Sequence, residues 1–215
     1  MTEAVARVAK VLALELDHGD RAVARILDAA RDQFAHFGVR RASIDDIAKR
    51  AGLSRNTVFR RLGSKEELVK AVVLRELREL IDEIDQVSRD GDIAERLARA
   101  FSTTVIRARS NPLMRAMLNH RPDEVLALAA LDGGLVLTVA VDYVAGIIQA
   151  DQERGAVAEE VDAMGVAELI VRTLQSIVLT PQVRVPLETE GDLRAFAATH
   201  LAPLLTTRAT STTGT

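Results

Sequence analysis

The spacing of the apolar residues constrains the fold of this chain more than any other feature of its sequence. Along most of the chain these residues recur three and four positions apart, which places them on one face of an α-helix. No strand-like alternation competes with this spacing, aromatic residues make up only 3% of the chain, and alanine and leucine are abundant. The sequence therefore predicts an all-α fold.

The composition excludes several kinds of site. The chain has 215 residues, enough for a sizeable core, and no cysteine, which excludes disulfide frameworks and thiolate metal sites. The four histidines, His18, His36, His120 and His200, are far apart and show no metal-ligand spacing. We expect neither a metal nor another cofactor, and the lack of cysteine fits a cytoplasmic protein.

The apolar segments differ from export signals and membrane spans. Charged residues such as Glu3, Arg7 and Lys10 interrupt the apolar run at the N-terminus. The most apolar segment, residues 133–150, contains Asp142 and two leading glycines, which favours a buried helix. We therefore expect a soluble protein.

Charge is distributed unevenly along the chain. Residues 21–75 contain 13 lysines and arginines against 6 aspartates and glutamates, whereas the rest of the chain contains 15 against 25. A basic segment beside an acidic remainder is typical of a polyanion-binding module attached to a part that does not bind polyanions. The alternative is a helical protein with an unevenly charged surface.

The basic segment contains several helix start and stop signals. Apolar residues on one stripe predict a helix over residues 21–37, with Gly38 as its C-terminal cap and a linker over residues 39–42. Ser43, with Asp46 three residues later, is expected to cap a short helix. Two short helices and a long one are therefore predicted to follow the linker.

Glycine and serine separate these later helices. Gly52 permits a left-handed turn, and Ser54 caps the next helix, which is only two turns long and ends at Gly63. Ser64 and Glu67 form a second capping box, which opens a long helix that reaches about Ser88. Two short capped helices around a glycine turn define a helix-turn-helix, whose second helix enters the DNA major groove.

The second short helix offers suitable donors. Val58 and Leu62 point inward, which leaves a set of polar side chains outside: Arg55, Asn56, Thr57, Arg60 and Arg61. Arginine can bond guanine in two places, asparagine can do the same with adenine, and the threonine methyl can touch thymine. Ser43 and Lys65 lie at flanking helix N-termini, where backbone amides favour phosphate, so we expect them to position the protein.

Residues 43–68 resemble the signature of the TetR family of bacterial transcriptional regulators. The matching features are the hydroxyl at Ser43, Ile-Ala at positions 47–48, Ala-Gly-Leu-Ser at positions 51–54 and Ser-Lys-Glu-Glu-Leu at positions 64–68. The clear match covers residues 26–73. The resemblance implies base or phosphate contacts from Ser43, Arg55, Asn56, Thr57, Arg60, Arg61 and Lys65.

Two positions depart from the family pattern. Most members have tyrosine where this chain has Phe59, and the tyrosine hydroxyl often meets a phosphate. Phe59 can pack against DNA but cannot donate that bond. Leu62 replaces a common aromatic residue, which should be tolerated because the position is apolar and inward.

The resemblance also implies a helical second domain that binds a small effector and dimerises through its last two long helices. The sequence predicts helices near residues 92–109, 113–130, 133–154, 161–180 and 190–205, and Pro203 is expected to end the last of them. The apolar spacing in 161–180 and 190–205 suits a dimer interface, although packing within one chain would produce the same pattern.

Candidates for the effector pocket are polar or aromatic residues set among apolar ones. Each could equally be a satisfied buried group or an exposed residue. The low charge of residues 113–149 favours an apolar ligand. The candidates are Arg107, Met114, Met117, Asn119, His120, Tyr143, Gln149, Arg172 and Gln175.

These observations predict four regions: an N-terminal extension (residues 1–20), a DNA-binding domain (21–73), a ligand-binding and dimerisation domain (74–206) and a disordered tail (207–215). The expected function is repression from an inverted-repeat operator, with release by a small effector that shifts the long helix after Ser64. The alternatives are an activator, a nucleoid-type DNA binder without an effector, and an all-helical enzyme. No nucleophile–base pair, carboxylate pair or metal cluster in the sequence supports an enzyme.

Overall fold

A computed structural model describes residues 20–120, 134–180 and 184–206, with only the backbone described for residues 117–120 and 135. Every regular element in these ranges is helical, which confirms the predicted all-α fold. The expected N-terminal extension, except for Asp20, and the expected tail lie outside the described residues. None of the described helices is both long and apolar enough to cross a membrane.

The described residues form a series of helices. In chain order they are α2 (Arg21–Arg41), α3 (Ile44–Ala51), α4 (Arg55–Leu62), α5 (Lys65–Val87), α6 (Ile93–Ser110), α7 (Pro112–His120), α9 (Leu135–Glu153), α10 (Ala163–Leu179), α11 (Glu190–Phe196), the π-helical segment η2 (Ala197–Leu201) and α12 (Pro203–Thr206).

The described residues divide into two compact units. One contains residues 20–81, 107–120 and 134–138, and the other contains residues 82–106, 139–180 and 184–206. Helix α5 starts in the first unit and ends in the second.

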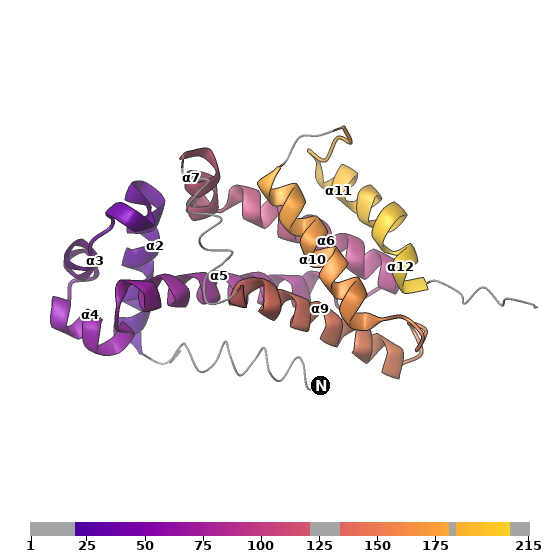
Figure 1. Ribbon diagram of the computed structural model, residues 1–215, viewed down its shortest axis with the longest axis horizontal. Helices are drawn as coiled ribbons and strands as arrows, with labels where there is room; N and C mark the ends of the chain where they lie inside the picture. The colour runs from indigo at the N-terminus through magenta and orange to yellow at the C-terminus, as the bar shows by residue number, and fades with distance from the viewer. Residues whose placement is uncertain (1–19, 121–133, 181–183, 207–215) are drawn as a thin grey trace, which may run out of the picture. The chain divides into compact units, whose positions relative to one another are not determined.

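The first unit contains a three-helix head, formed by α2, α3 and α4, which packs with the start of α5 (Figure 1). One apolar residue from each helix is fully buried in its core: Ile26, Ile47, Val58 and Leu68 are each at most 1% exposed. These positions lie on the apolar stripes that the spacing predicts. Helix α7 also packs against α2 within this unit.

Helix α2 differs from its predicted form at its C-terminal end. Gly38 has a left-handed φ of 80° and breaks the helix as expected, but residues 39–41 form one more helical turn where a linker was expected. The Ala42 amide donates to the Gly38 carbonyl, and the Ala42 side chain is buried. Burial of the Ala42 side chain favours the helical turn over residues 39–41, because an extended linker would expose this side chain.

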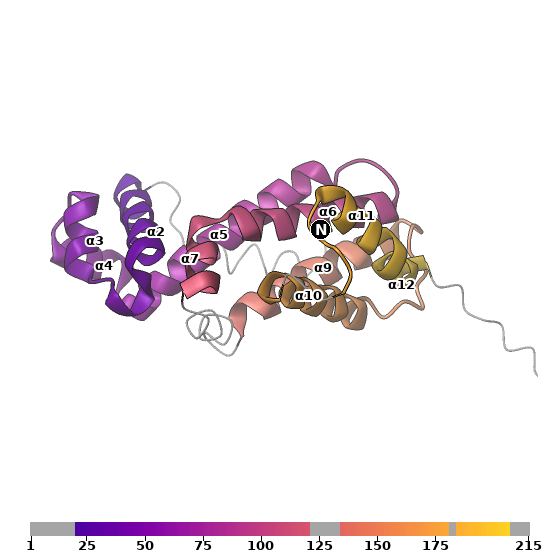
Figure 2. The same cartoon turned by 90° about the horizontal axis from the view of Figure 1, so that it is seen from above.

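Two apolar clusters lie among the described residues of the second unit. In one, Phe101 of α6 stacks on Phe196 of α11 with ring centroids 5.8 Å apart, beside Leu193 and Leu201. In the other, α9 and α10 pack together through Ile148 and Ala167, and Figure 2 shows these two helices side by side.

The end of this unit corrects one prediction. The last helix was expected to end near Pro203, yet Pro203 begins the final helical turn, α12, and Leu205 in that turn is buried. Proline is tolerated in the first turn of a helix, and burial of Leu205 stabilises the extra turn. The helix predicted over 113–130 is described only as α7, because the rest of that segment lies outside the described residues.

Candidate nucleic-acid interface

The N-terminus of α3 is fixed by Ser43 and Asp46. The Ser43 Oγ accepts from the Asp46 amide at 3.1 Å and donates to Asp46 Oδ2 at 2.6 Å. The predicted pairing of these residues is confirmed, although Asp46 bonds the Ser43 hydroxyl and not its backbone amide. The Ser43 hydroxyl already donates its proton to Asp46. A phosphate at this helix end would therefore bond most readily to the remaining backbone amides of the first turn of α3.

The turn between the two short helices requires Gly52. Its backbone is left-handed, with φ 65° and ψ 37°, and its amide donates to the carbonyls of Ala48 and Lys49. A Cβ at this position would lie 2.5 Å from Nη2 of Arg25, which donates to the Ala51 carbonyl. Arg25 of α2 therefore caps the C-terminal end of α3, a role that sequence analysis did not identify.

Helix α4 presents its polar side chains outward, as its sequence predicts. Ser54 caps the helix by accepting from the Thr57 amide at 3.1 Å, and Val58 anchors the inner face with 1% exposure. Leu62 is half-buried, while the Phe59 side chain is 62% exposed. The other outward residues are Arg55, Asn56, Arg60 and Arg61, which are exposed, and Thr57, which is half-buried.

These outward side chains differ in their internal partners. Arg55 forms an exposed ion pair with Asp45 at 3.0 Å, and Arg61 pairs with Asp20, the residue that caps α2. Within the described residues, Asn56 and Arg60 have no side-chain hydrogen bond or ion pair. Asn56 and Arg60 therefore need to break no contact before they meet another molecule. An exposed pair such as Arg55–Asp45 contributes about 1 kcal/mol or less and is readily exchanged.

A capping box fixes the start of α5, as predicted. The Ser64 amide donates to Glu67 Oε2 at 2.7 Å, and the Glu67 amide donates to Ser64 Oγ at 3.2 Å. Lys65 lies beside this box, and its Nζ donates to the Arg40 carbonyl at 3.0 Å. Lys65 therefore ties α5 to the end of α2 while its ammonium stays near a helix N-terminus.

The candidate effector residues are spread over both units. Arg107 donates to Glu79 at 3.0 Å in the first unit, where the half-buried Met114 also lies. The side chains of Met117, Asn119 and His120 lie outside the described residues. Gln149 and Gln175 are half-buried in the second unit.

Two further candidates already have polar partners in the second unit. Arg172 is an exposed residue bonded to Glu168 one helical turn earlier. The buried Tyr143 hydroxyl donates to Asp85. Burial raises the pKa of Tyr143, and the bond to Asp85 raises it further, so the phenol stays neutral. These two side chains are satisfied without a ligand.

Comparison with known proteins gives a consistent result over both halves of the chain. Residues 26–72 match a family model described as bacterial regulatory proteins of the tetR family, and residues 92–199 match the model of the tetracyclin repressor C-terminal domain. An HTH-type transcriptional regulator of Mycobacterium tuberculosis is 30% identical over 186 residues, which cover 85% of this chain and 84% of the relative.

Solved structures have a similar fold. The TetR family repressor AlkX of a Dietzia species, implicated in biodegradation of n-alkanes, is 25% identical with a TM-score of 0.62 and covers 85% of this chain and 94% of its own. The regulator FadR of Bacillus subtilis, solved with stearoyl-CoA, is 20% identical with a TM-score of 0.60 and covers 84% of this chain and 96% of its own.

Proposed function

This chain belongs to the TetR family of ligand-responsive, DNA-binding transcriptional regulators, and we propose that it is a homodimeric repressor released from an inverted-repeat operator by an apolar small molecule. Like its relatives, it is a transcriptional regulator and not an enzyme. A bacterial repressor acts on the chromosome, so we place its action in the cytoplasm.

The outward face of α4 carries this proposal. Asn56 and Arg60 are exposed and free to bond base edges, and Arg55 can exchange Asp45 for guanine. Arg61 and Thr57 complete the surface, while Phe59 contributes packing alone. Ser43 and Lys65 lie at helix N-termini on either side of α4, where they would contact phosphates and fix the register of the helix in the groove.

The proposed dimer forms through α10 and the helical segments of residues 190–205, and two exposed apolar side chains of α10 support the part of α10 in it. Met164 and Leu169 of α10 are 45% and 48% exposed in the single chain, and covering them with a partner chain would remove apolar surface from water. A two-fold dimer presents two copies of α4 to two half-sites, so its operator would be an inverted repeat.

The effector is proposed to be apolar for two reasons. The segment over residues 113–149 carries few charges, and the similar Dietzia repressor is implicated in n-alkane biodegradation. Release requires that the effector bind the DNA-free protein more tightly, because a ligand shifts an equilibrium only by its differential affinity. We propose that it does so by moving α5, which leads directly into the head.

Selection of bound genomic fragments tests this function. The purified protein should retain fragments that share an inverted repeat, and competition with unrelated duplex should not remove them. A nucleoid-type binder would instead retain fragments without a common site. Placing the recovered site before a reporter then distinguishes repression from activation. A long-chain apolar compound suggested by the neighbouring genes should lower operator affinity, and an unchanged affinity across such compounds would contradict ligand release.

A further inference from the structure

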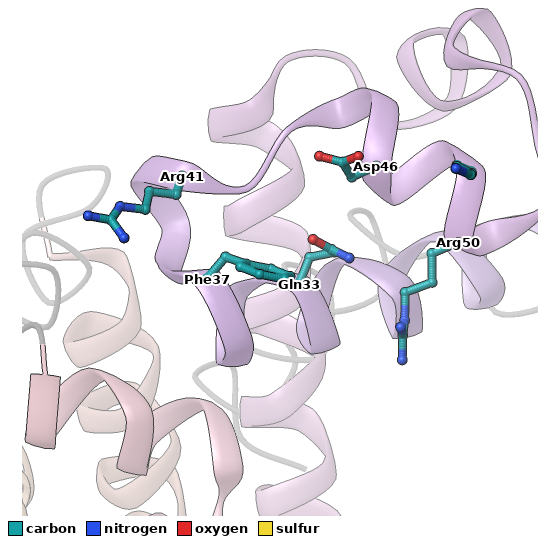
Figure 3. A pocket seen from close by; sticks show the side chains of 6 residues that line it. Gln33, Phe37, Arg41, Asp46 and Arg50 are labelled. Carbon is teal, nitrogen blue, oxygen red and sulfur yellow. The ribbon is translucent and has the colours of Figure 1, made fainter.

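A hollow of about 540 Å³ lies on the three-helix head and is lined by residues of α2 and α3. Figure 3 shows Gln33 and Phe37 side by side on α2, Asp46 and Arg50 on the neighbouring α3, and Arg41 extending from the end of α2. Lys49 of α3 completes the lining, so three cationic side chains and one carboxylate surround an exposed aromatic ring. We call Arg41 and Lys49, with the hollow between them, the α2–α3 flank.

The charged residues of this lining differ in whether they have partners. Arg50 pairs with Asp32 at 2.7 Å, and the Asp46 carboxylate accepts from Ser43 at 2.6 Å. Arg41 and Lys49 are both exposed and, within the part of the chain that the structure describes, neither has a hydrogen-bond or ion-pair partner. The α2–α3 flank therefore carries two positive charges that the fold itself does not use.

The flank differs in this respect from three other cations of the head, although not from Arg21 at the start of α2, which is exposed and also has no partner among the described residues. Arg25, Arg61 and Lys65 each bond a carbonyl or carboxylate of the same unit, so each has a role in holding the head together. Arg41 and Lys49 have no such bond among the described residues. Arg60 of α4 also lacks a partner among the described residues, and it lies on the face assigned to DNA.

We propose that the α2–α3 flank binds the DNA sugar-phosphate backbone beyond the bases that α4 reads. This inference rests on the proposed function, because the hollow adjoins Ser43, the residue proposed to contact phosphate: Asp46, which bonds Ser43, is part of its lining. Arg41 stands two residues before Ser43, and Lys49 lies on the same short helix that Ser43 caps. Arg41, Lys49 and Asp46, the bonding partner of Ser43, line one hollow, so a DNA backbone at the N-terminus of α3 that extends along this hollow would meet two free positive charges that match phosphate.

The neutral residues of the hollow suit this occupant. The Gln33 amide can donate to a phosphate oxygen, and the Phe37 ring, 52% exposed, offers an apolar surface for a deoxyribose. The Asp46 charge opposes DNA, but its hydrogen bond from Ser43 lowers that opposition and two cations outweigh it. An acidic protein segment is the competing occupant, and the position of the hollow beside Ser43 favours DNA.

The test is the salt dependence of DNA binding by the full chain carrying Arg41→Ala and Lys49→Ala together. The probes are a duplex of about 30 base pairs containing the selected operator, a random duplex of equal length, and the operator trimmed to its two half-sites. The slope of log Kd against log salt should fall by roughly 0.9 for each phosphate that the variant no longer neutralises, about 1.8 for each protomer. The fall should appear on both long duplexes and disappear on the trimmed one.

Two controls make the result specific. Arg89→Ala with Arg184→Ala removes the same charge from exposed residues outside the head and should leave the slope unchanged. Arg41→Lys with Lys49→Arg keeps the charge and should retain the wild-type slope. Circular dichroism and thermal unfolding verify that each variant folds.

Several outcomes would overturn the inference. They are an unchanged slope in the Arg41 and Lys49 alanine variant, an equal fall in the Arg89 and Arg184 control, and an equal fall on trimmed and long duplexes. Normal DNA binding without repression in cells would instead assign the flank to a protein partner. Failure of the proposed function itself looks different, because the wild-type protein would then show no preference for the selected operator over the random duplex.

Discussion

The donors on α4 differ in what each must give up to bind DNA. Asn56 and Arg60 are exposed and have no partner among the described residues, Arg55 must leave Asp45, and Arg61 must leave Asp20. Asp20 also accepts from the Ala22 amide at 2.8 Å as the cap of α2. Arg61 therefore connects the end of α4 to the start of α2, and its replacement would alter the head's packing as well as its DNA contacts.

Asn56 provides the cleanest test of base reading for this reason. We expect Asn56→Ala to weaken operator binding by about 1–3 kcal/mol and to relax the base preference at one position of each half-site. Lys65→Ala should instead weaken all duplexes alike and reduce the salt slope by about 0.9 per protomer. Fluorescence anisotropy with operator and single-base variants measures both effects. A uniform loss of affinity for Asn56→Ala, with altered base preference for Lys65→Ala, would show that the two roles are reversed.

At the scale of elements, the glycine turn between α3 and α4 sets the position of the reading helix. Gly52 and Gly155 have similar left-handed φ angles, 65° and 71°, but a Cβ would meet Arg25 at Gly52 and nothing within 4 Å at Gly155. Gly155→Ala should therefore cost only backbone strain, about 1–2 kcal/mol. Gly52→Ala should cost more, because Arg25 must also release the Ala51 carbonyl.

Thermal unfolding and amide hydrogen exchange compare the two glycine variants. The Gly52 variant should show faster exchange in α3 and α4, and the Gly155 variant should not. Equal reductions of stability, with no local change in the head, would mean that Arg25 does not support the turn.

A polar network in the first unit links α7 to α5. The side chain of Asn111 forms this link. Its Nδ2 donates to Glu76 of α5, and its Oδ1 accepts from the backbone amides of Leu113 and Met114 at the start of α7. Asn111→Asp should keep this cap, because aspartate is also a strong N-cap, but it places a carboxylate against Glu76. We expect α7 to exchange its amide hydrogens faster, as measured by mass spectrometry, while α3 and α4 exchange as before. Unchanged exchange in α7 would show that this hydrogen bond does not hold the helix.

Most elements could be predicted because their signals are local. Three serines predict helix starts because each caps its helix through a hydrogen bond with a residue three positions later: Ser43, Ser54 and Ser64. The spacing of apolar residues predicts the buried faces. The contacts of Arg25, Asp20 and Lys65 could not be predicted, because they join residues distant in sequence and depend on how the helices pack. The extra turn at Pro203 was missed because burial of Leu205 overrides the local stop signal. The effector residues stay a prediction. A polar residue among apolar ones can belong to a ligand pocket or to a hydrogen-bonded pair within the protein, such as Tyr143–Asp85, and the sequence pattern is the same in both cases.

At the scale of the whole molecule, function is proposed to require two copies of the chain. Leu169→Glu should introduce a charge into the proposed α10 interface and favour monomers, as sedimentation velocity would measure. Val185→Glu makes the same chemical change at a side chain of similar exposure, 52%, outside α10 and should leave the dimer intact. A dimeric Leu169→Glu protein would place the interface elsewhere.

The uneven charge of the chain suits a DNA-binding protein in two ways. The basic residues 21–75 provide the attraction to DNA, and the acidic remainder limits nonspecific contact by the rest of the protein. Attraction of this kind acts on every sequence, so it gives affinity without selectivity. Selectivity must come from α4 and from the pairing of two half-sites.

Competition binding therefore tests the proposed selectivity most directly. The wild-type protein is titrated against the selected inverted repeat and against a duplex of the same length and base composition in which one half-site is scrambled. We predict a preference of about a thousandfold or more for the intact repeat, with two chains bound to each duplex. Equal affinity for the two duplexes would contradict reading of the operator by a dimer.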